Sequence, residues 1–439
     1  MRLKTALCGM LGGALCALLC GCSIFPANTD ELLSPPGLVG DDAAIAEALK
    51  SAAGSDCVLQ YPAAGDRRSS IVRQDLDGDG AKEAFAFYRK GAADETMHLN
   101  LICARQSGWR SVADLEVTAG NVERIDFCDL DGDGVLEILV GWDVLNATEK
   151  TVGVYDWTGK ELQRLTAQPY TQYCCCDLAG TGTPDLLIQR LSAAENTNRA
   201  ALFRFSDGGV TEISSCMMDR AVKSIQSVTV SATTSGVPAV YVEELKSAGA
   251  VTEVLLSVKG ELSNPLLDRT AAENIRAAHP ASLSAADINH DGVPEIPVAV
   301  TLPSVDADSA EQAHYTEWRG FDGEGLIERE VWLIDFNDDY VLKIPEKWTG
   351  KLMVRKDAKQ RRNILFAMNP DGTAGEWLLD LQTADAKEWD AFPLAGYTEV
   401  LRIENRVVAA KTTEGTPLAL TMAEVRAMIS RYEQGENLK

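Results

Sequence analysis

A nine-residue acidic motif recurs along the chain and constrains its fold more than any other feature of the sequence. Three copies are complete: DLDGDGAKE at residues 75–83, DLDGDGVLE at 129–137 and DINHDGVPE at 287–295. A degenerate copy at 177–185 keeps only its first and last acids, and another at 231–239 keeps Gly-Val-Pro but no acid. The five copies start 48 to 56 residues apart, a spacing typical of propeller blades and other repeat arrays.

The segments around each motif have the pattern of strands rather than the periodicity of helices. Apolar residues precede the second motif at 125–128 and follow it at 137–140. Each repeat then has a further apolar stretch followed by a turn, at 99–104, 153–157, 202–205 and 254–258. Because four strands per repeat match a propeller blade, we predict a mainly β fold. The predicted architecture is a β-propeller of six or seven four-stranded blades with short terminal helices.

The number of blades depends on the C-terminal part of the chain. An incomplete sixth motif at 335–339 has Tyr340 where the turn glycine would stand. A sixth blade would combine residues 332–335, 340–344, 364–368 and 377–381. A seventh would close the ring if the hairpin 400–409 paired with residues 57–61. Helices are expected at 42–52 and after Thr421, which has the capping-box spacing to Glu424.

The acidic motif has the composition of a calcium-binding loop. Acids at positions 1, 3 and 5 turn their side-chain oxygens to one side, and glycine at position 6 permits the positive φ of the bend. Position 7 offers its carbonyl, and the acid at position 9 closes the shell. Oxygen ligands suit Ca²⁺ better than zinc or copper. The predicted ligands are Asp75, Asp77, Asp79, Ala81 and Glu83; Asp129, Asp131, Asp133, Val135 and Glu137; and Asp287, Asn289, Asp291, Val293 and Glu295.

An EF-hand and an acidic turn without a metal are the other interpretations of this motif. An EF-hand needs glutamate at position 12 between two helices, but Ala86, Val140 and Val298 stand there, each in a predicted strand. Acidic turns without a metal are the alternative for each single copy. We expect weak or no metal binding at 177–185, and the sequence leaves metal binding at 231–239 open. His290 is expected to point into solvent.

These motifs resemble the FG-GAP or VCBS repeats of integrin α-chain heads and of many bacterial surface proteins. The resemblance covers roughly residues 69–345. It implies a β-propeller with calcium in the hairpin that joins the first two strands of a blade. The chain departs from that family in three ways: position 9 is glutamate where the family usually has aspartate, two copies are degenerate, and no clear motif follows Asp339.

The N-terminus predicts export and lipidation. Arg2 and Lys4 precede an apolar stretch at 6–19, which is too short to span a bilayer and therefore fits a cleaved signal. Residues 19–22, LCGC, resemble the bacterial lipobox, and only Cys22 is preceded by glycine. We therefore expect a lipid on Cys22 that anchors the protein to a bacterial membrane outside the cytoplasm. Ordinary cleavage without a lipid is the alternative, and the sequence does not indicate which membrane.

The predicted domains follow from these features. Residues 1–21 are a signal peptide, 22–40 a tether, 41–62 an N-terminal helix and closing strand, 63–410 the propeller, and 411–439 a C-terminal helix and tail. The seven cysteines after the lipobox are odd in number and lack paired spacing, so a disulfide framework is not expected.

Charge and motif content narrow the function. The formal net charge is −24 and becomes more negative when Arg2 and Lys4 are removed, which makes nucleic acid an unsuitable partner. Four histidines and no Gly-x-Ser-x-Gly, His-Glu-x-x-His or phosphate loop give no catalytic site. We expect a non-enzymatic binding or scaffold module for an extracytoplasmic protein or glycan. The alternative is a propeller-fold carbohydrate-active enzyme, a hydrolase or lyase that uses carboxylates.

Overall fold

The computed structural model describes residues 40–91, 95–145, 147, 149–305 and 314–432. The predicted signal peptide, the tether and the lipidation site Cys22 lie outside these residues. None of the helices in the described part of the chain has the length and apolarity needed to cross a membrane.

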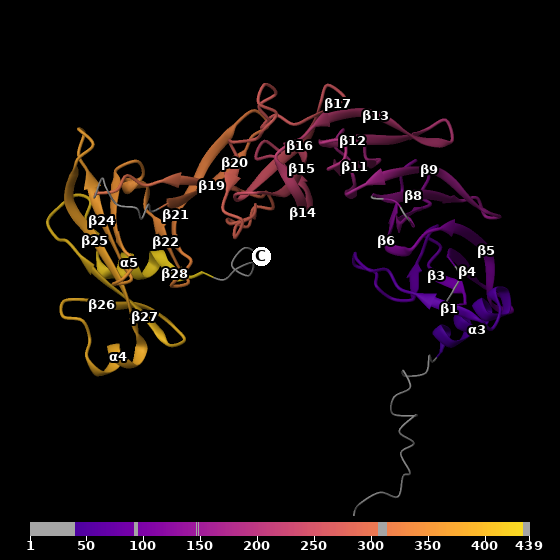
Figure 1. Cartoon of the computed structure of the whole chain (residues 1–439), viewed down its shortest axis with the longest axis horizontal. Coiled ribbons are helices and arrows are strands. Elements are labelled where there is room, and N and C mark those ends of the chain that lie inside the picture. The colour runs from indigo at the N-terminus through magenta and orange to yellow at the C-terminus, as the bar shows by residue number, and fades with distance from the viewer. Residues whose placement is uncertain (1–39, 92–94, 146, 148, 306–313, 433–439) are drawn as a thin grey trace, which may run out of the picture.

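Six antiparallel sheets follow one another along the described chain, which makes the protein mainly β as predicted. Figure 1 shows the sheets side by side around an arc, with the first and the sixth at its two ends. In the second and third sheets, four strands pair strictly in sequence order, which is the meander of a propeller blade. The predicted blade-like repeat is therefore confirmed, and the described residues form six such units.

The first three sheets contain the first three motifs in their connections. Sheet 1 consists of β1 (Cys57–Gln60), β2 (Ile71–Gln74), β3 (Glu83–Lys90), β4 (Thr96–Arg105) and β5 (Gly108–Thr118). Sheet 2 consists of β6 (Asn121–Cys128), β7 (Glu137–Asp143), β8 (Lys150–Trp157) and β9 (Leu162–Tyr170). Sheet 3 consists of β10 (Gln172–Cys176), β11 (Asp185–Ser192), β12 (Thr197–Ser206) and β13 (Gly209–Met217).

The remaining sheets are less regular. Sheet 4 consists of β14 (Val222–Ala232), β15 (Pro238–Lys246), β16 (Ala250–Val258), β17 (Glu261–Ser263) and β18 (Ala278–His279). Sheet 5 consists of β19 (Ile296–Thr301), β20 (His314–Phe321), β21 (Leu326–Asp335), β22 (Tyr340–Ile344) and β28 (Ile429–Arg431). Sheet 6 consists of β23 (Leu352–Asp357), β24 (Arg362–Met368), β25 (Ala374–Asp385), β26 (Thr398–Ile403) and β27 (Arg406–Thr412).

Short helices accompany the first and last sheets. Helix α3 (Asp41–Ala53) packs Ile45 and Leu49 against sheet 1. Helix α5 (Met422–Met428) begins with the predicted capping box, in which Thr421 and Glu424 each accept a hydrogen bond from the other's backbone amide. Helix α4 (Ala386–Ala391) and the short η1 (Glu346–Trp348) were not expected from the sequence.

Neighbouring sheets are held together by apolar layers. Between the first two sheets, for example, Phe87 packs edge to face on Trp142 at 5.8 Å between ring centroids. Equivalent buried clusters join sheets 2 and 3, 3 and 4, 4 and 5, and 5 and 6. Inner strands such as β7 are therefore buried on both faces, whereas outer strands such as β5 have many exposed positions. This explains why the inner strands have nearly continuous apolar sequences.

The predicted closing contact between the chain ends does not form. Strand β1 pairs with β3, where it continues the edge that β2 begins. The hairpin of β26 and β27 instead extends sheet 6 by pairing with β25. Val407 to Ala410 are fully buried there, so burial against their own sheet outweighs a distant pairing. No strand pairing in the described residues links sheet 6 to sheet 1.

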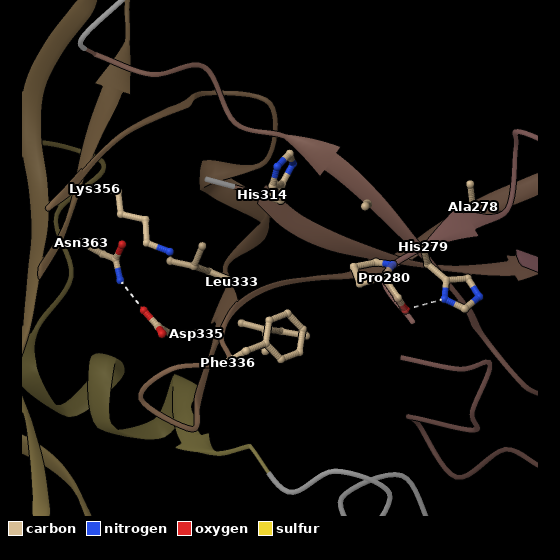
Figure 2. A pocket seen from close by; sticks show the side chains of 11 residues that line it. Ala278, His279, Pro280, His314, Leu333, Asp335, Phe336, Lys356 and Asn363 are labelled. Atoms are coloured by element: carbon tan, nitrogen blue, oxygen red, sulfur yellow. Dashed lines mark hydrogen bonds between the residues drawn. The ribbon is translucent and has the colours of Figure 1, made fainter. Parts of the chain in front are cut away.

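The predicted composition of the sixth blade is also wrong. Residues 332–335 do pair with 340–344, and β24 does pair with β25. However, β21 and β22 belong to sheet 5, whereas β24 and β25 belong to sheet 6. In the sequence, η1 and β23 lie between the two pairs. Between the two sheets lies a cavity of about 440 Å³, shown in Figure 2.

Candidate metal-binding loops

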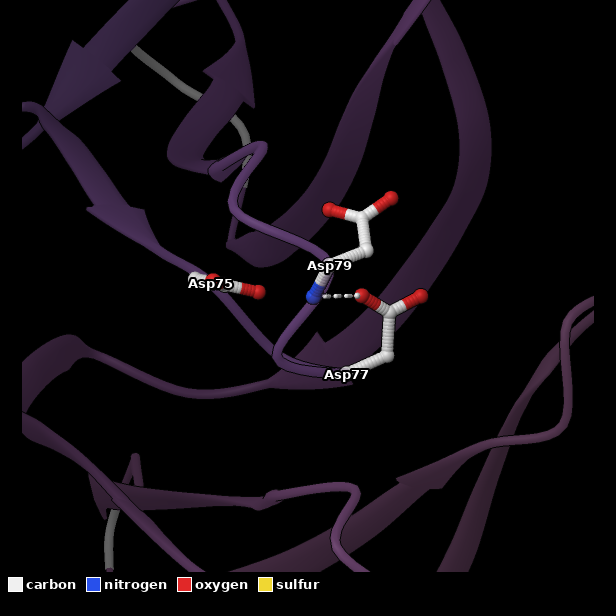
Figure 3. A group of neighbouring side chains, drawn as sticks. All are labelled: Asp75, Asp77 and Asp79. Atoms are coloured by element: carbon white, nitrogen blue, oxygen red, sulfur yellow. Dashed lines mark hydrogen bonds between the residues drawn. The ribbon is translucent and has the colours of Figure 1, made fainter.

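The first acidic motif forms a tight loop between β2 and β3. Asp75 accepts hydrogen bonds from the amides of Gly78 and Gly80, at 2.8 and 3.0 Å. Gly78 and Gly80 have φ of +72° and +89°, which explains why glycine recurs there. One carboxylate oxygen from each of Asp75, Asp77 and Asp79 lies within 4.8 Å of the others (Figure 3). Three of the four predicted acids are thus brought together in this loop, and Glu83 is not part of the group.

The second motif repeats this geometry between β6 and β7. Asp129 accepts from the amides of Gly132 and Gly134, at 2.7 and 3.1 Å. Here the ninth residue completes the group, because oxygens of Asp129, Asp131 and Glu137 lie within 4.8 Å of one another. Glu137 is only 2 % exposed.

The third complete motif precedes β19 and differs in its third residue. Asp287 accepts from the amides of Asp291 and Gly292, at positions 5 and 6, whereas the donors in the first two loops stand at positions 4 and 6. The side-chain amide nitrogen of Asn289, however, donates hydrogen bonds to the carboxylates of both Asp291 and Glu295, at 3.1 and 2.8 Å. Asp287, Asp291 and Glu295 are not among the groups of converging acids found in the described residues.

Backbone geometry at the remaining predicted positions is shared by all three loops. The amides of Ala81, Val135 and Val293 donate to the carboxylate two residues before them, at 2.7 to 2.8 Å. Their carbonyl oxygens are the predicted ligand atoms, and that role stays a prediction. His290 is exposed, as expected, and has φ of +62° where the other copies have glycine.

The acid at position 9 is oriented by a contact that the sequence analysis missed. Its carboxylate accepts a hydrogen bond from the amide of the second residue in each loop: Leu76 to Glu83 at 3.0 Å, Leu130 to Glu137 at 2.6 Å, and Ile288 to Glu295 at 3.2 Å. These second residues are at most 8 % exposed. An apolar residue at position 2 of every acidic copy was the available signal.

Electrostatics in these loops disfavour ionised carboxylates in the absence of a cation. Burial raises the pKa of Glu83, Glu137 and Glu295, and the other acids of each loop raise it further. The pKa of Glu137 reaches about 7. Burial and the neighbouring Asp133 and Asp129 also raise the pKa of Asp131. A bound cation would relieve this repulsion.

The degenerate loop at 177–185 is stabilised by an arginine. Arg204 donates two hydrogen bonds to the carboxylate of Asp185, at 2.7 and 2.6 Å, and Asp185 is 2 % exposed. At Asp177, burial acts to raise the pKa, but hydrogen bonds from the amides of Gly182 and Thr181 outweigh it and lower the pKa. The two carboxylates of this loop therefore have protein partners of their own.

The incomplete sixth motif follows the same pattern. Asp335 accepts from the side-chain amide of Asn363, Asp338 pairs with Arg361, and Asp339 pairs with Arg406. Its acids are therefore held by protein groups, and the segment forms the turn between β21 and β22. These partners could not be predicted from the sequence, because they lie 23 to 67 residues away from the acids in the chain.

Contacts between loops place them along one edge of the array. The amide of Leu136 in the second loop donates to the carbonyl of Leu76 in the first, at 2.8 Å. The hydroxyl of Ser231, at the end of β14, donates to the carbonyl of Gly292 in the third complete loop, at 2.9 Å. Order within the loops therefore affects the alignment of neighbouring sheets.

The cavity between sheets 5 and 6 is the main concave site apart from the loops. Its lining is largely apolar, and Phe336 is exposed (Figure 2). The polar groups of the lining are His279, His314, Asp335, Lys356 and Asn363. Lys356 has no ion-pair partner among the residues that the structure describes. Trp142, Trp318 and Trp348 are at most 2 % exposed and belong to the core, so they are not available to stack on a sugar.

Comparisons with known proteins give no family. No family model and no curated protein matches the chain. Three similar solved structures are a Bacillus licheniformis rhamnogalacturonan lyase PL11 (13% identity, 83% of this chain and 93% of that one, TM-score 0.30), the Dos1 propeller (10%, 80% and 81%, 0.31) and the exotype rhamnogalacturonan lyase YesX (13%, 84% and 77%, 0.29). At these TM-scores none of the three likenesses bears on the function of this chain.

Proposed function

We propose that the protein is a calcium-stabilised, β-propeller-like module, anchored outside the cytoplasm through Cys22, that binds or scaffolds an extracytoplasmic protein or glycan. One observation carries the calcium part of this proposal. Glu137 and Glu295 are buried and Glu83 is half-buried, each beside other acids of its loop. None of the three forms an ion pair with a described residue, whereas Asp185 of the degenerate loop pairs with Arg204. The FG-GAP or VCBS resemblance of the sequence supports the same assignment.

A structural role for the ion suits the position of the loops. One loop connects β2 to β3 in sheet 1, and another connects β6 to β7 in sheet 2. A backbone hydrogen bond joins these two loops directly. An ion there would neutralise the crowded acids and fix the register of both sheets. Calcium in extracellular modules typically binds at about 10⁻⁴ to 10⁻³ M, so the loops would be filled at millimolar calcium.

The binding role is favoured over the carbohydrate-active enzyme by the cavity between sheets 5 and 6. Hydrolysis by carboxylates needs two of them on opposite sides of the bond that is cleaved. Asp335 is the one acid in the described lining of this cavity, and it is hydrogen-bonded to Asn363. Turnover of a glycan by the purified protein, lost when one carboxylate outside the loops is replaced, would contradict the proposal.

The test of the calcium part compares two loop variants with the parent. Millimolar calcium should raise the melting temperature of the full-length protein, because it binds the folded state preferentially. Asp131→Ala should lose a large part of this shift, because it removes a ligand of the best-formed site. Thr181→Ala alters the degenerate loop and should keep the full shift. Equal losses in both variants, or no calcium effect on the parent, would show that the loops are acidic turns.

A further inference from the structure

Two glutamates are buried against each other between sheets 3 and 4, away from the acidic loops. Glu244 on β15 and Glu253 on β16 are both 0 % exposed. In the register of these strands Glu253 is opposite Val242, so the two glutamates are diagonal neighbours on one face. The two carboxyl groups are close enough that the charge of Glu253 raises the pKa of Glu244, and two adjacent buried carboxylates favour sharing one proton.

The hydrogen-bond donors around the pair show which glutamate carries this proton. Both oxygens of Glu253 already accept: Oε2 from the amide of Asp219 at 3.0 Å, and Oε1 from Asn264 Nδ2 at 2.6 Å. On Glu244, Oε1 accepts from the side-chain amides of Gln189 and Asn198. Glu244 Oε2 is buried and has no donor among the described residues. An ionised Glu253 and a protonated Glu244 Oε2 satisfy every oxygen of the pair.

No cation among the described residues forms an ion pair with Glu244 or Glu253. Lys246 is committed to Asp219, with Nζ 2.8 Å from Oδ2, and its other acidic neighbour is Glu273 at 3.8 Å. Asp219 itself is buried and adds negative charge beside the pair. On β13, burial and then the charge of Glu253 raise the pKa of the Cys216 thiol to about 12, against the opposing charges of Arg199 and Arg269.

We propose that Glu244 is a neutral carboxylic acid whose O–H donates to the ionised carboxylate of Glu253, and that loss of this proton in alkaline solution weakens the contact between sheets 3 and 4. Gln189 and Asn198 lie on β11 and β12 of sheet 3, so the pair and its donors bridge the two sheets. Deprotonation would place two adjacent negative charges in this interface, where water cannot solvate them.

The direction of the pH effect follows from proton linkage. Burial, and then the charge of Glu253, raise the pKa of Glu244 well above its ordinary value of 4.5. The folded protein therefore holds a proton that the unfolded chain releases above this value. Stability from the pair is complete below pH 4.5 and is lost as the pH rises towards the folded pKa. In this range the ratio of folded to unfolded protein should fall by about tenfold per pH unit.

The test replaces each glutamate in turn by glutamine in the full-length protein. Melting temperatures are measured from pH 5 to pH 10 in saturating calcium, and each variant is compared with the parent at the same pH, so that titration elsewhere cancels. Glu244→Gln keeps a donor towards Glu253 and should match the parent at pH 5 but exceed it increasingly as the pH rises. Glu253→Gln should melt lower at every pH, because a glutamine amide cannot accept on both sides.

Two results would overturn the proposal. If Glu244→Gln follows the parent's pH profile, or if the two variants lose stability equally, no proton resides on Glu244. If Glu244→Gln is destabilised at every pH and also loses bound metal by elemental analysis, the pair is a cation site. The structure argues against a cation, because amide nitrogens rather than oxygens of Gln189 and Asn198 face Glu244.

Discussion

At the scale of single residues, the partner of the ninth-position acid distinguishes the loops. In the complete copies this acid accepts a backbone hydrogen bond and is crowded by other carboxylates, whereas Asp185 is paired with Arg204. The acid at position 9 therefore has one of two electrostatic environments. In one, an arginine neutralises the acid, and in the other, burial and neighbouring carboxylates favour its protonated form.

The first prediction concerns Glu137, whose pKa is about 7 in the folded protein against an ordinary 4.5. Because the folded state binds this proton more tightly, its stabilising effect is complete below pH 4.5 and is lost as the pH rises through about 7. In the presence of a chelator, Glu137→Gln should therefore be more stable than the parent at pH 8, by up to about 3 kcal/mol. In millimolar calcium the order should reverse, because the variant lacks a ligand.

Chemical denaturation with and without calcium at pH 5 and pH 8 measures both effects. Glu161→Gln, an exposed glutamate at the turn before β9, is a suitable control that should leave all four values unchanged. A Glu137→Gln variant that is less stable than the parent in chelator at pH 8 would contradict the prediction.

At the scale of elements, the loop at 177–185 shows how an arginine on β12 takes the place that we assign to calcium elsewhere. Arg204→Ala would leave the buried carboxylate of Asp185 without its two charged hydrogen bonds. We expect a loss of about 2 kcal/mol in the free energy of unfolding, because Arg204 itself is 43 % exposed and the pair is partly solvated. The loss should be the same with and without calcium.

Arg199→Ala provides the matched control on the same strand. Arg199 pairs with Glu212 at the surface, where both side chains are about 40 % exposed, so its removal should cost less than about 1 kcal/mol. Urea denaturation of the two variants measures the difference. A loss in Arg204→Ala that calcium restores would show that this loop also binds the ion.

At the scale of the whole molecule, six sheets stacked around an arc expose a large, strongly acidic surface, and the chain has a net charge of −24. Such a surface is repelled by anionic lipid headgroups, so membrane attachment would depend on the lipid at Cys22. Cys22→Ser should release the protein into the soluble fraction or leave an unprocessed precursor. Detergent partitioning of wild type and variant measures this. Unchanged partitioning with normal processing would exclude the anchor.

The sequence by itself determined the repeat, the terminal helices and the strand-loop-strand setting of the motifs that begin at 75, 129 and 177. The motif that begins at 287 is followed by β19 but is preceded only by the isolated bridge of Ala286 with Glu295. These features are local: acids, glycines and apolar runs at fixed spacing favour one backbone conformation whatever lies nearby. The same local spacing brings Asp75, Asp77 and Asp79 together, as predicted.

Only the tertiary structure decided which partners satisfy each acid and where the chain ends pair. Arg204, Arg361 and Asn363 are brought to their acids by strands distant in sequence, and no pattern in the motifs records them. Strand β1 and the β26–β27 hairpin joined their own sheets because burying their apolar faces locally costs less entropy than closing a ring of the whole chain. The Glu244–Glu253 pair was likewise invisible in the sequence, since it depends on strand register and on side chains from two sheets meeting in a space without water.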